Sequence, residues 1–192
     1  MSEQPSKTKL SERFPKLCYA WLPVLLVAID RISKVWVNTV LKEKECIPII
    51  GNAVTFRYIE NSGAAWGIFN NSVDVLTIAS VLVIVGIFFI LKRVPSDKRF
   101  RPLLLTLLLI ISGAFGNLYD RLVYHHVKDF ISFDVIHFPV FNIADIYVTC
   151  ATFLLVILLL FVYKEEELSF LPFFGGDTQK QSKKSDGDTE SK

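Results

Sequence analysis

The sequence predicts a mainly α-helical membrane protein with four transmembrane helices, a small β-sheet in the first extracytoplasmic link and both termini in the cytoplasm. Of its 192 residues, 52% are hydrophobic, a share too high for a soluble domain of this size. The apolar residues gather in four runs, each long enough to cross roughly 30 Å of hydrocarbon as a helix. The basic residues cluster at the N-terminus and between the second and third runs, which fixes the predicted orientation.

The four spans are predicted at about residues 18–40, 73–91, 102–119 and 143–163, within a membrane domain of residues 16–164. The first run is not a cleavable signal peptide, because Asp30 and Lys34 lie where small residues would precede a cleavage site. The polar segments 1–15 and 165–192 cannot bury enough apolar surface to order themselves. We therefore expect two disordered cytoplasmic tails.

The links at about 41–72 and 120–142 are sparse in lysine and arginine for their length, so they are predicted to face outward. In the first of them, "AVTFRYI" alternates apolar and polar side chains and is followed by "NSG", a turn sequence. Period-two alternation before a turn is typical of a β-strand. This strand is the basis of the predicted outer sheet.

Polar side chains within the spans are the most informative feature, because each charge there costs roughly 2.5 to 3.5 kcal/mol on insertion scales. On the third span, Gly113, Gly116, Asn117 and Asp120 share one helical face. The first span adds Asp30 and Lys34, and the fourth adds Asn142 and Asp145. With Arg121 and Asp129, they all approach the outer end of the predicted bundle.

One interpretation is that these groups only join helices, with Asp120 paired to Arg121 and with Arg57 and Lys128 solvated. It leaves more carboxylates than cations. Two carboxylates in a site of low dielectric can share a proton, so that one acts as general acid and the other as general base on a water molecule. By spacing alone, the partner of Asp145 is either Asp120 or Asp129.

Two other classes of function compete with water-activating hydrolysis. A transporter or channel could use the aspartates as a proton or cation relay, but its polar groups would be expected near the membrane midplane within repeated halves. A purely structural membrane subunit would explain the helix faces but not the surplus carboxylates. The histidines in "HHVKD" lack the spacing of a metal site, so no metal is expected.

Five blocks carry a resemblance to a known family: "AIDRISK", "ENSGAAW", "SGAFGNLYDRL", "VKDF" and "FNIAD", in this order. The chain resembles the bacterial lipoprotein signal peptidases, or signal peptidase II. This resemblance implies an intramembrane aspartyl endopeptidase of the bacterial cytoplasmic (inner) membrane. Such an enzyme removes the signal peptide from a prolipoprotein just before its diacylglyceryl-modified cysteine, at a site near the extracytoplasmic face.

The resemblance also implies roles for single residues. Asp129 in "VKDF" and Asp145 in "FNIAD" correspond to the catalytic aspartates. The residues that correspond to substrate-binding or supporting positions are Asp30, Lys34, Asn61, Gly63, Asn117, Asp120, Arg121 and Asn142. We expect diacylglyceryl-modified prolipoproteins and membrane lipid as partners, no nucleic acid, no cofactor and a monomer. Ser112 departs from the family, in which glycine is common at this position.

Overall fold

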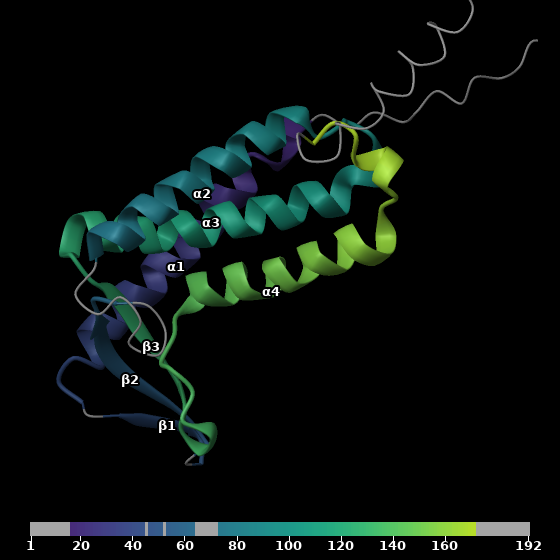
Figure 1. The fold of residues 1–192 in the computed structure, drawn as a ribbon. Coiled ribbons are helices and arrows are strands. Elements are labelled where there is room, and N and C mark those ends of the chain that lie inside the picture. Colours follow the sequence, from purple (N-terminus) through teal and green to yellow (C-terminus); the bar gives the residue numbers. More distant parts are fainter. Residues whose placement is uncertain (1–15, 45, 52, 64–72, 172–192) are drawn as a thin grey trace, which may run out of the picture.

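The computed structural model describes residues 16–44, 46–51, 53–63 and 73–171 (Figure 1). Its four helices are α1 (Trp21–Val40), α2 (Val73–Arg93), α3 (Arg101–Tyr124) and α4 (Ile143–Ile157), and a π-helical turn (Leu158–Val162) continues α4. Each predicted span therefore coincides with a helix. The predicted tail 1–15 and residues 172–192 of the C-terminal tail lie outside the described residues.

Among the described residues, three helical segments are long and apolar enough to cross a membrane: Val73–Arg93, Lys98–Tyr124 and Ile143–Val162. The chain is thus a multi-pass membrane protein. Helix α1 has 20 residues but carries Asp30, Arg31 and Lys34 within them, which lowers its apolar character. That α1 also crosses the membrane stays a prediction, as does the cytoplasmic position of the termini.

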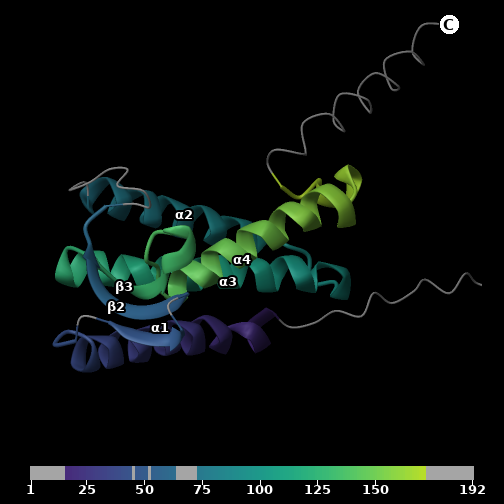
Figure 2. The same ribbon diagram turned by 90° about the horizontal axis from the view of Figure 1, so that it is seen from below.

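Helix α3 is the centre of the bundle. In its apolar stretch 72% of the residues are buried, compared with 6% in α2 and 11% in α4. Two glycines of α3 permit α4 and α1 to approach closely. A Cβ on Gly113 would collide with the carbonyl oxygen of Ala144 in α4, and one on Gly116 would lie 2.6 Å from a carboxylate oxygen of Asp30 in α1. Close packing therefore brings α1 and α4 against the polar face of α3 (Figure 2).

A three-stranded antiparallel sheet packs at one end of the bundle, with β1 (Ile47–Ile50), β2 (Val54–Asn61) and β3 (Val127–Phe133) in that order. The alternating segment forms β2, as predicted. The third strand comes from the second link, which the sequence did not predict to be a strand. Residues 127–130 of β3 are all buried, so the segment lacks the alternation of a half-exposed strand.

The pairing of β2 with β3 joins the link between α1 and α2 to the link between α3 and α4, so that Ile59 lies opposite Asp129 and Asn61 opposite Val127. A small apolar cluster of Val37, Leu41 and Phe130 fixes the sheet to the end of α1. His125 ends α3 in a left-handed conformation with φ of 59°, and its N–H donates to the carbonyl of Arg121. This cap turns the chain from α3 into β3.

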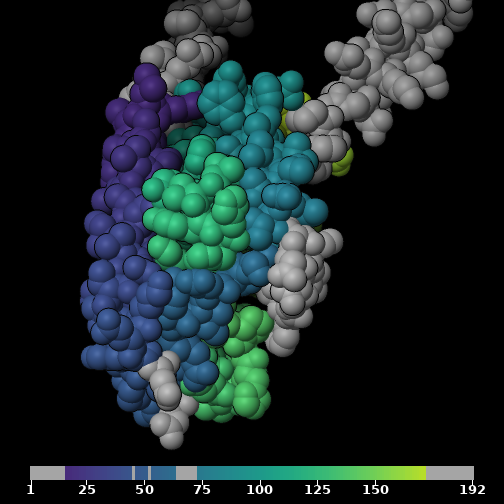
Figure 3. All heavy atoms as spheres, turned by 90° about the vertical axis from the view of Figure 1, so that its left-hand side faces the viewer, coloured from purple at the N-terminus to yellow at the C-terminus, as the bar shows by residue number. Residues whose placement is uncertain are grey.

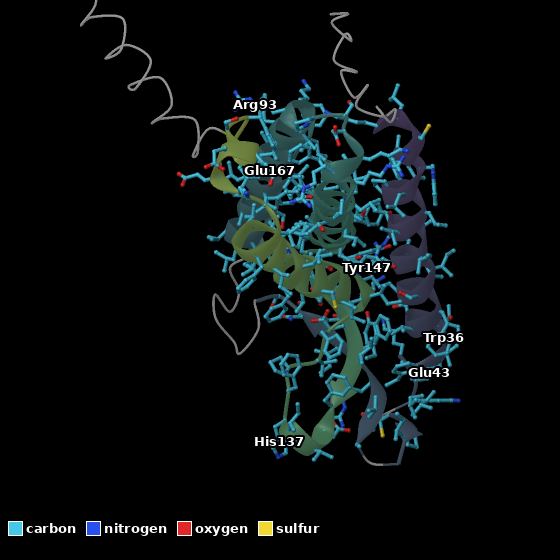
Figure 4. The ribbon with its side chains drawn as sticks, turned by 90° about the vertical axis from the view of Figure 1, so that its right-hand side faces the viewer. Trp36, Glu43, Arg93, His137, Tyr147 and Glu167 are labelled. Atoms are coloured by element: carbon cyan, nitrogen blue, oxygen red, sulfur yellow. The ribbon has the colours of Figure 1, made fainter. Side chains whose placement is uncertain are left out.

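The first and last described segments lie together at the end of the bundle away from the sheet (Figure 1). Figure 4 shows Arg93 and Glu167 at that end and His137 at the tip of the opposite one. Residues Glu165–Leu168 form a 3-10 turn, and Leu168 and Leu171 are buried in the bundle. The prediction that the chain is disordered from residue 165 is therefore wrong for 165–171, because these leucines dock on the helices.

Candidate active site

Asp129 and Asp145 reach one site from different elements. Asp129 lies in the middle of β3 and is 2% exposed. Asp145 is the third residue of α4, in its first turn. The strand and the helix start are joined through Phe141, whose carbonyl accepts hydrogen bonds from the N–H groups of Phe130 and Ile131. This connection holds the start of α4 beside the middle of β3.

Asn142 links the two carboxylates and is itself fully buried. Its side-chain amide donates to Asp129 Oδ1 at 2.7 Å, and its backbone N–H donates to Asp145 Oδ2 at 3.0 Å. Its carbonyl oxygen Oδ1 accepts from the N–H of Asp145 at 3.1 Å. The last two bonds form a capping box, a reciprocal arrangement that satisfies the free N–H groups of a helix start. One residue thus begins α4 and aligns both aspartates.

Two further asparagines donate hydrogen bonds to the two aspartates. Asn61 Nδ2 donates to Asp129 Oδ2 at 2.8 Å, and Asn117 Nδ2 donates to Asp145 Oδ1 at 2.7 Å. Asn61 is in turn held by the backbone N–H of Gly63, 3.0 Å from its Oδ1. Each of the four carboxylate oxygens therefore accepts one N–H from an amide. Amides orient carboxylates without neutralising them, which leaves their acid–base chemistry intact.

The environment favours the protonated form of Asp129. Burial raises the pKa of Asp129 to about 7, and the negative charge of Asp145 acts in the same direction. The hydrogen bonds from Asn61 and Asn142 oppose this shift. With this raised pKa, Asp129 can hold a proton near neutral pH beside the carboxylate of Asp145, and general acid–base catalysis requires one such proton donor and one acceptor.

A second buried cluster, next to the first, holds charges in balance. Lys34 Nζ lies 3.0 Å from Asp30 Oδ2, 2.8 Å from Asp120 Oδ2 and 3.0 Å from Asn117 Oδ1. Arg31 Nη1 lies 2.6 Å from Asp120 Oδ1. Asp30 Oδ1 also accepts from the N–H of Ala144 at 3.2 Å. This cluster ties α1 to α3 and to the start of α4.

The cluster corrects two expectations. Asp120 does not pair with Arg121, because adjacent helical residues point in different directions. Arg121 instead donates to Ser80 Oγ at 3.2 Å, on α2. Lys128 is not solvated, since only 8% of it is exposed. Arg57 does lie near the surface, where it binds Asp134 at 2.8 Å.

A cavity of about 470 Å³ opens beside the two aspartates. Its polar wall includes Asp129, Asp145 and Arg121, and Asn61, Gly63 and Asn117 also line it. The rest of the wall is largely apolar and comes from β3, the following link and α4: Val127, Phe133, Phe138, Pro139, Val140, Phe141, Ile146, Thr149 and Cys150. The cavity therefore combines polar groups that can take part in chemistry with a largely apolar wall.

The structure brings all ten predicted site residues into these two adjoining clusters. Asp129, Asp145, Asn61, Asn117, Gly63 and Arg121 line the cavity, Asn142 lies behind the aspartates, and Asp30, Lys34 and Asp120 form the buried ion cluster. Sequence reasoning missed Arg31 and the phenylalanines of the wall. The need for a second cation to balance Asp30 and Asp120 could have identified Arg31. Within the described residues, no three His, Cys, Asp or Glu side chains are grouped to hold a metal ion.

Comparisons of the sequence with a family model and with curated proteins match the chain to the same family. A family model described as signal peptidase (SPase) II matches residues 22–161. A lipoprotein signal peptidase of Clostridium acetobutylicum is 42% identical over 144 residues, which cover 71% of this chain and 92% of that protein. One from Clostridioides difficile is 38% identical over 147 residues, covering 76% of this chain and 96% of that protein.

Two solved structures share the fold. A bacterial membrane enzyme solved by the in meso method at 2.3 Å resolution superposes with a TM-score of 0.69 and 26% identity, over 79% of this chain and 92% of that one. Another, at 1.9 Å resolution, gives a TM-score of 0.67 and 25% identity, over 80% of this chain and 99% of that one.

Proposed function

The chain belongs to the signal peptidase II family, and we propose that it cuts diacylglyceryl-modified prolipoproteins just before the modified cysteine, with Asp129 and Asp145 activating water. Family membership makes it an aspartic-type signal peptidase, a class that cleaves signal peptides from prolipoproteins. The transporter and the purely structural subunit are thereby set aside. What remains to be assigned is which residues act and how the substrate is selected.

The observation that carries the proposal is that Asn142 donates one hydrogen bond to each of the two aspartates, which line the cavity. Asp120, the alternative partner of Asp145, is fully buried and held by Lys34 and Arg31. A carboxylate neutralised by two cations is a poor general base. Asp129 has only amide partners and lines the cavity. These differences favour Asp129 as the partner.

In the proposed reaction, a water molecule lies between the two carboxyl groups. The ionised aspartate takes a proton from the water as its oxygen bonds to the carbonyl carbon of the scissile peptide, and the protonated aspartate donates its proton to the carbonyl oxygen. The tetrahedral intermediate then breaks its C–N bond: the leaving amine takes the proton that the dyad received from water, and a hydroxyl of the intermediate returns its proton to the other aspartate. Asn117 and Asn142 hold the carboxylates in position, and the Arg121 guanidinium donates to a substrate carbonyl.

The signal-peptide helix enters from the membrane and unwinds locally, because a peptide within a fully hydrogen-bonded helix cannot present its carbonyl for attack. The sheet lies over the site during this step, and Asn61 and Gly63 at the end of β2 contact the substrate backbone. The proposed enzyme works as a monomer in the bacterial inner membrane. Its site lies near the extracytoplasmic face, which the distribution of basic residues supports.

Selectivity for the lipid-modified precursor is attributed to the apolar wall of the cavity. Phe133, Phe138 and Phe141 line the same cavity as the two aspartates. Acyl chains that leave the bilayer for this wall are not transferred from water, so their contribution is van der Waals packing and the placement of the modified cysteine beside the aspartates. A precursor without the diacylglyceryl group loses this contribution and is expected to remain uncut.

The test is cleavage of a synthetic diacylglyceryl-modified precursor by purified protein in detergent. We expect wild type to cut before the modified cysteine, and Asp129→Asn and Asp145→Asn to lose activity while they keep the wild-type circular dichroism spectrum. Asp134→Asn is the matched control, because Asp134 lies near the same sheet but does not line the cavity. An active Asp129→Asn enzyme, or equal cleavage of the unmodified precursor, would refute the corresponding part of the proposal.

A further inference from the structure

A second cavity, of about 390 Å³, lies on the surface between α1 and the end of α3. It shares no lining residue with the cavity at the aspartates. Its walls are formed by Val27, Arg31, Lys34, Val35, Tyr119, Tyr124 and Lys128. Figure 3 views the molecule from this side, with the end of α3 (green) beside α1 (purple to blue). Three cations and two tyrosines thus surround one small space.

Arg31 presents donors that no described acceptor satisfies. Its Nη1 binds Asp120 at 2.6 Å, and its guanidinium carbon lies 4.7 Å from the centroid of the Tyr119 ring. The other two nitrogens, Nε and Nη2, are buried without a hydrogen-bond partner, and Nη2 is 3.6 Å from Asp30. Buried donors that lack an acceptor cost free energy, so a ligand oxygen at this point would stabilise the fold.

Lys128 is the second unusual cation, because only 8% of it is exposed. Its ammonium nitrogen lies 3.7 Å from the centroid of the Tyr124 ring, and among the described residues no carboxylate oxygen lies within 4 Å of that nitrogen. Glu60 is opposite Lys128 in the sheet, but its carboxylate accepts from the Tyr58 hydroxyl at 2.9 Å. Burial lowers the pKa of Lys128. A bound anion would counteract that effect.

The buried and partly buried charges around this cavity are mostly positive. The three cations Arg31, Lys34 and Lys128 face the two carboxylates Asp30 and Asp120, and the half-exposed carboxylate of Glu60 also acts on Lys128. An arginine fork beside a lysine and tyrosines is well suited to a phosphate group, which has a negative charge and several acceptor oxygens. Glu60 lies nearby but is half exposed and bound elsewhere.

The surroundings indicate a lipid as the source of that phosphate. The two helices that line the cavity, α1 and α3, carry exposed apolar side chains, which include Val24, Ile32, Val35, Leu122 and Val123, each at least 50% exposed. Such a surface on a membrane protein faces hydrocarbon, and tyrosines are enriched where hydrocarbon meets the headgroups. We propose that this cavity binds the phosphate of a membrane phospholipid, with Arg31 and Lys128 as its donors and the acyl chains along α1 and α3.

This proposal does not depend on the catalytic roles of Asp129 and Asp145. It is tested by native mass spectrometry of the full chain, purified in detergent and titrated with phosphatidylglycerol. Lys128→Gln removes the ammonium, and Arg31→Lys keeps a charge for Asp120 but removes the Nε and Nη2 donors. We expect each variant to bind roughly tenfold more weakly than wild type, as for loss of one charge-assisted hydrogen bond.

Lys42→Gln is the matched control. Lys42 also lies at the outer end of α1 near a tyrosine ring, 6.0 Å from the centroid of Tyr58, but it does not line the cavity. Unchanged binding in Lys128→Gln and Arg31→Lys, or an equal loss in Lys42→Gln, would overturn the site. If inorganic phosphate binds as tightly as the phospholipid, the acyl chains contribute nothing and the assignment to a lipid is wrong. Melting temperature in detergent verifies that each variant is folded.

Discussion

Asn142 carries two functions that a single substitution can separate. Serine also caps helices, so Asn142→Ser should preserve the start of α4, but it lacks the amide that donates to Asp129 at 2.7 Å. We predict that cleavage falls by roughly 10² to 10³, as for removal of one preorganised donor from an active site. Single-turnover rates on the modified precursor measure this loss. Near-normal cleavage by a folded variant would remove Asn142 from the proposed machinery.

The raised pKa of Asp129 has a consequence for stability. In the fold this pKa is about 7, compared with an ordinary value of 3.8, so the folded state binds more protons than the unfolded state between these pH values. The free energy of unfolding contributed by Asp129 therefore falls as the pH rises through this window. Asp129→Asn removes the buried charge. The melting temperature of the variant, relative to wild type, should therefore be higher at about pH 8 than near pH 5.

Asp134 is the control for this pH dependence, because its pKa is shifted the other way. Hydrogen bonds from Ser132 and Thr55 and the charge of Arg57 lower the pKa of Asp134. Its carboxylate stabilises the fold above its ordinary pKa, and this contribution is lost only in acid. Asp134→Asn should lower the melting temperature about equally near pH 5 and about pH 8. The same pH trend in both variants would contradict the assignment of the titration to Asp129.

At the scale of elements, the approach of α3 to α4 depends on a missing side chain. A Cβ on Gly113 would overlap the backbone carbonyl of Ala144 and lie 2.7 Å from a methyl group of Val148. Backbone cannot rotate away as a flexible side chain can. We predict that Gly113→Ala costs about 1 to 3 kcal/mol, as in other overpacked interiors. Because α4 carries Asp145, cleavage should fall as well.

Gly86 in α2 is the matched control for this helix contact. A Cβ there would meet nothing within 4 Å. Alanine is the better helix former by about 1 kcal/mol in soluble helices, so Gly86→Ala should be neutral or slightly stabilising. Thermal unfolding in detergent compares the two variants. Equal destabilisation by both would show that helix propensity or membrane insertion, and not the contact with Ala144, determines the effect.

The elements also differ in how far the sequence predicts them. All four helices and β2 follow from hydropathy and period-two alternation, which are local properties of the chain. Strand β3 was missed because its residues 127–130 are buried on both faces and do not alternate. Strand β1 is short and contains Pro48, which cannot donate to a neighbouring strand. Both strands pair with β2. Strand β1 is close to β2 in the sequence, whereas β3 pairs with β2 across some 70 residues, which is not a local property of the chain.

At the scale of the whole molecule, the native cysteines can report its orientation. Cys18 and Cys46 are both exposed and lie at opposite ends of α1. In vesicles of known sidedness, an impermeant maleimide should label a variant that keeps only Cys46 from the extracytoplasmic side. A variant that keeps only Cys18 should be labelled from the cytoplasmic side. Labelling of both from one side would show that α1 does not cross the membrane.

Three properties were fixed by the sequence alone: the membrane class, the set of polar residues at one end of the bundle, and the resemblance that the family comparisons confirm. The tertiary structure decided how those residues divide. Asp120 lies between Lys34 and Arg31, whereas Asp129 and Asp145 meet through Asn142 at a cavity. Hydropathy and spacing report on neighbours along the chain. The partners of a buried carboxylate depend on how close helices approach and on the register of strands from separate links, which only the packed chain defines.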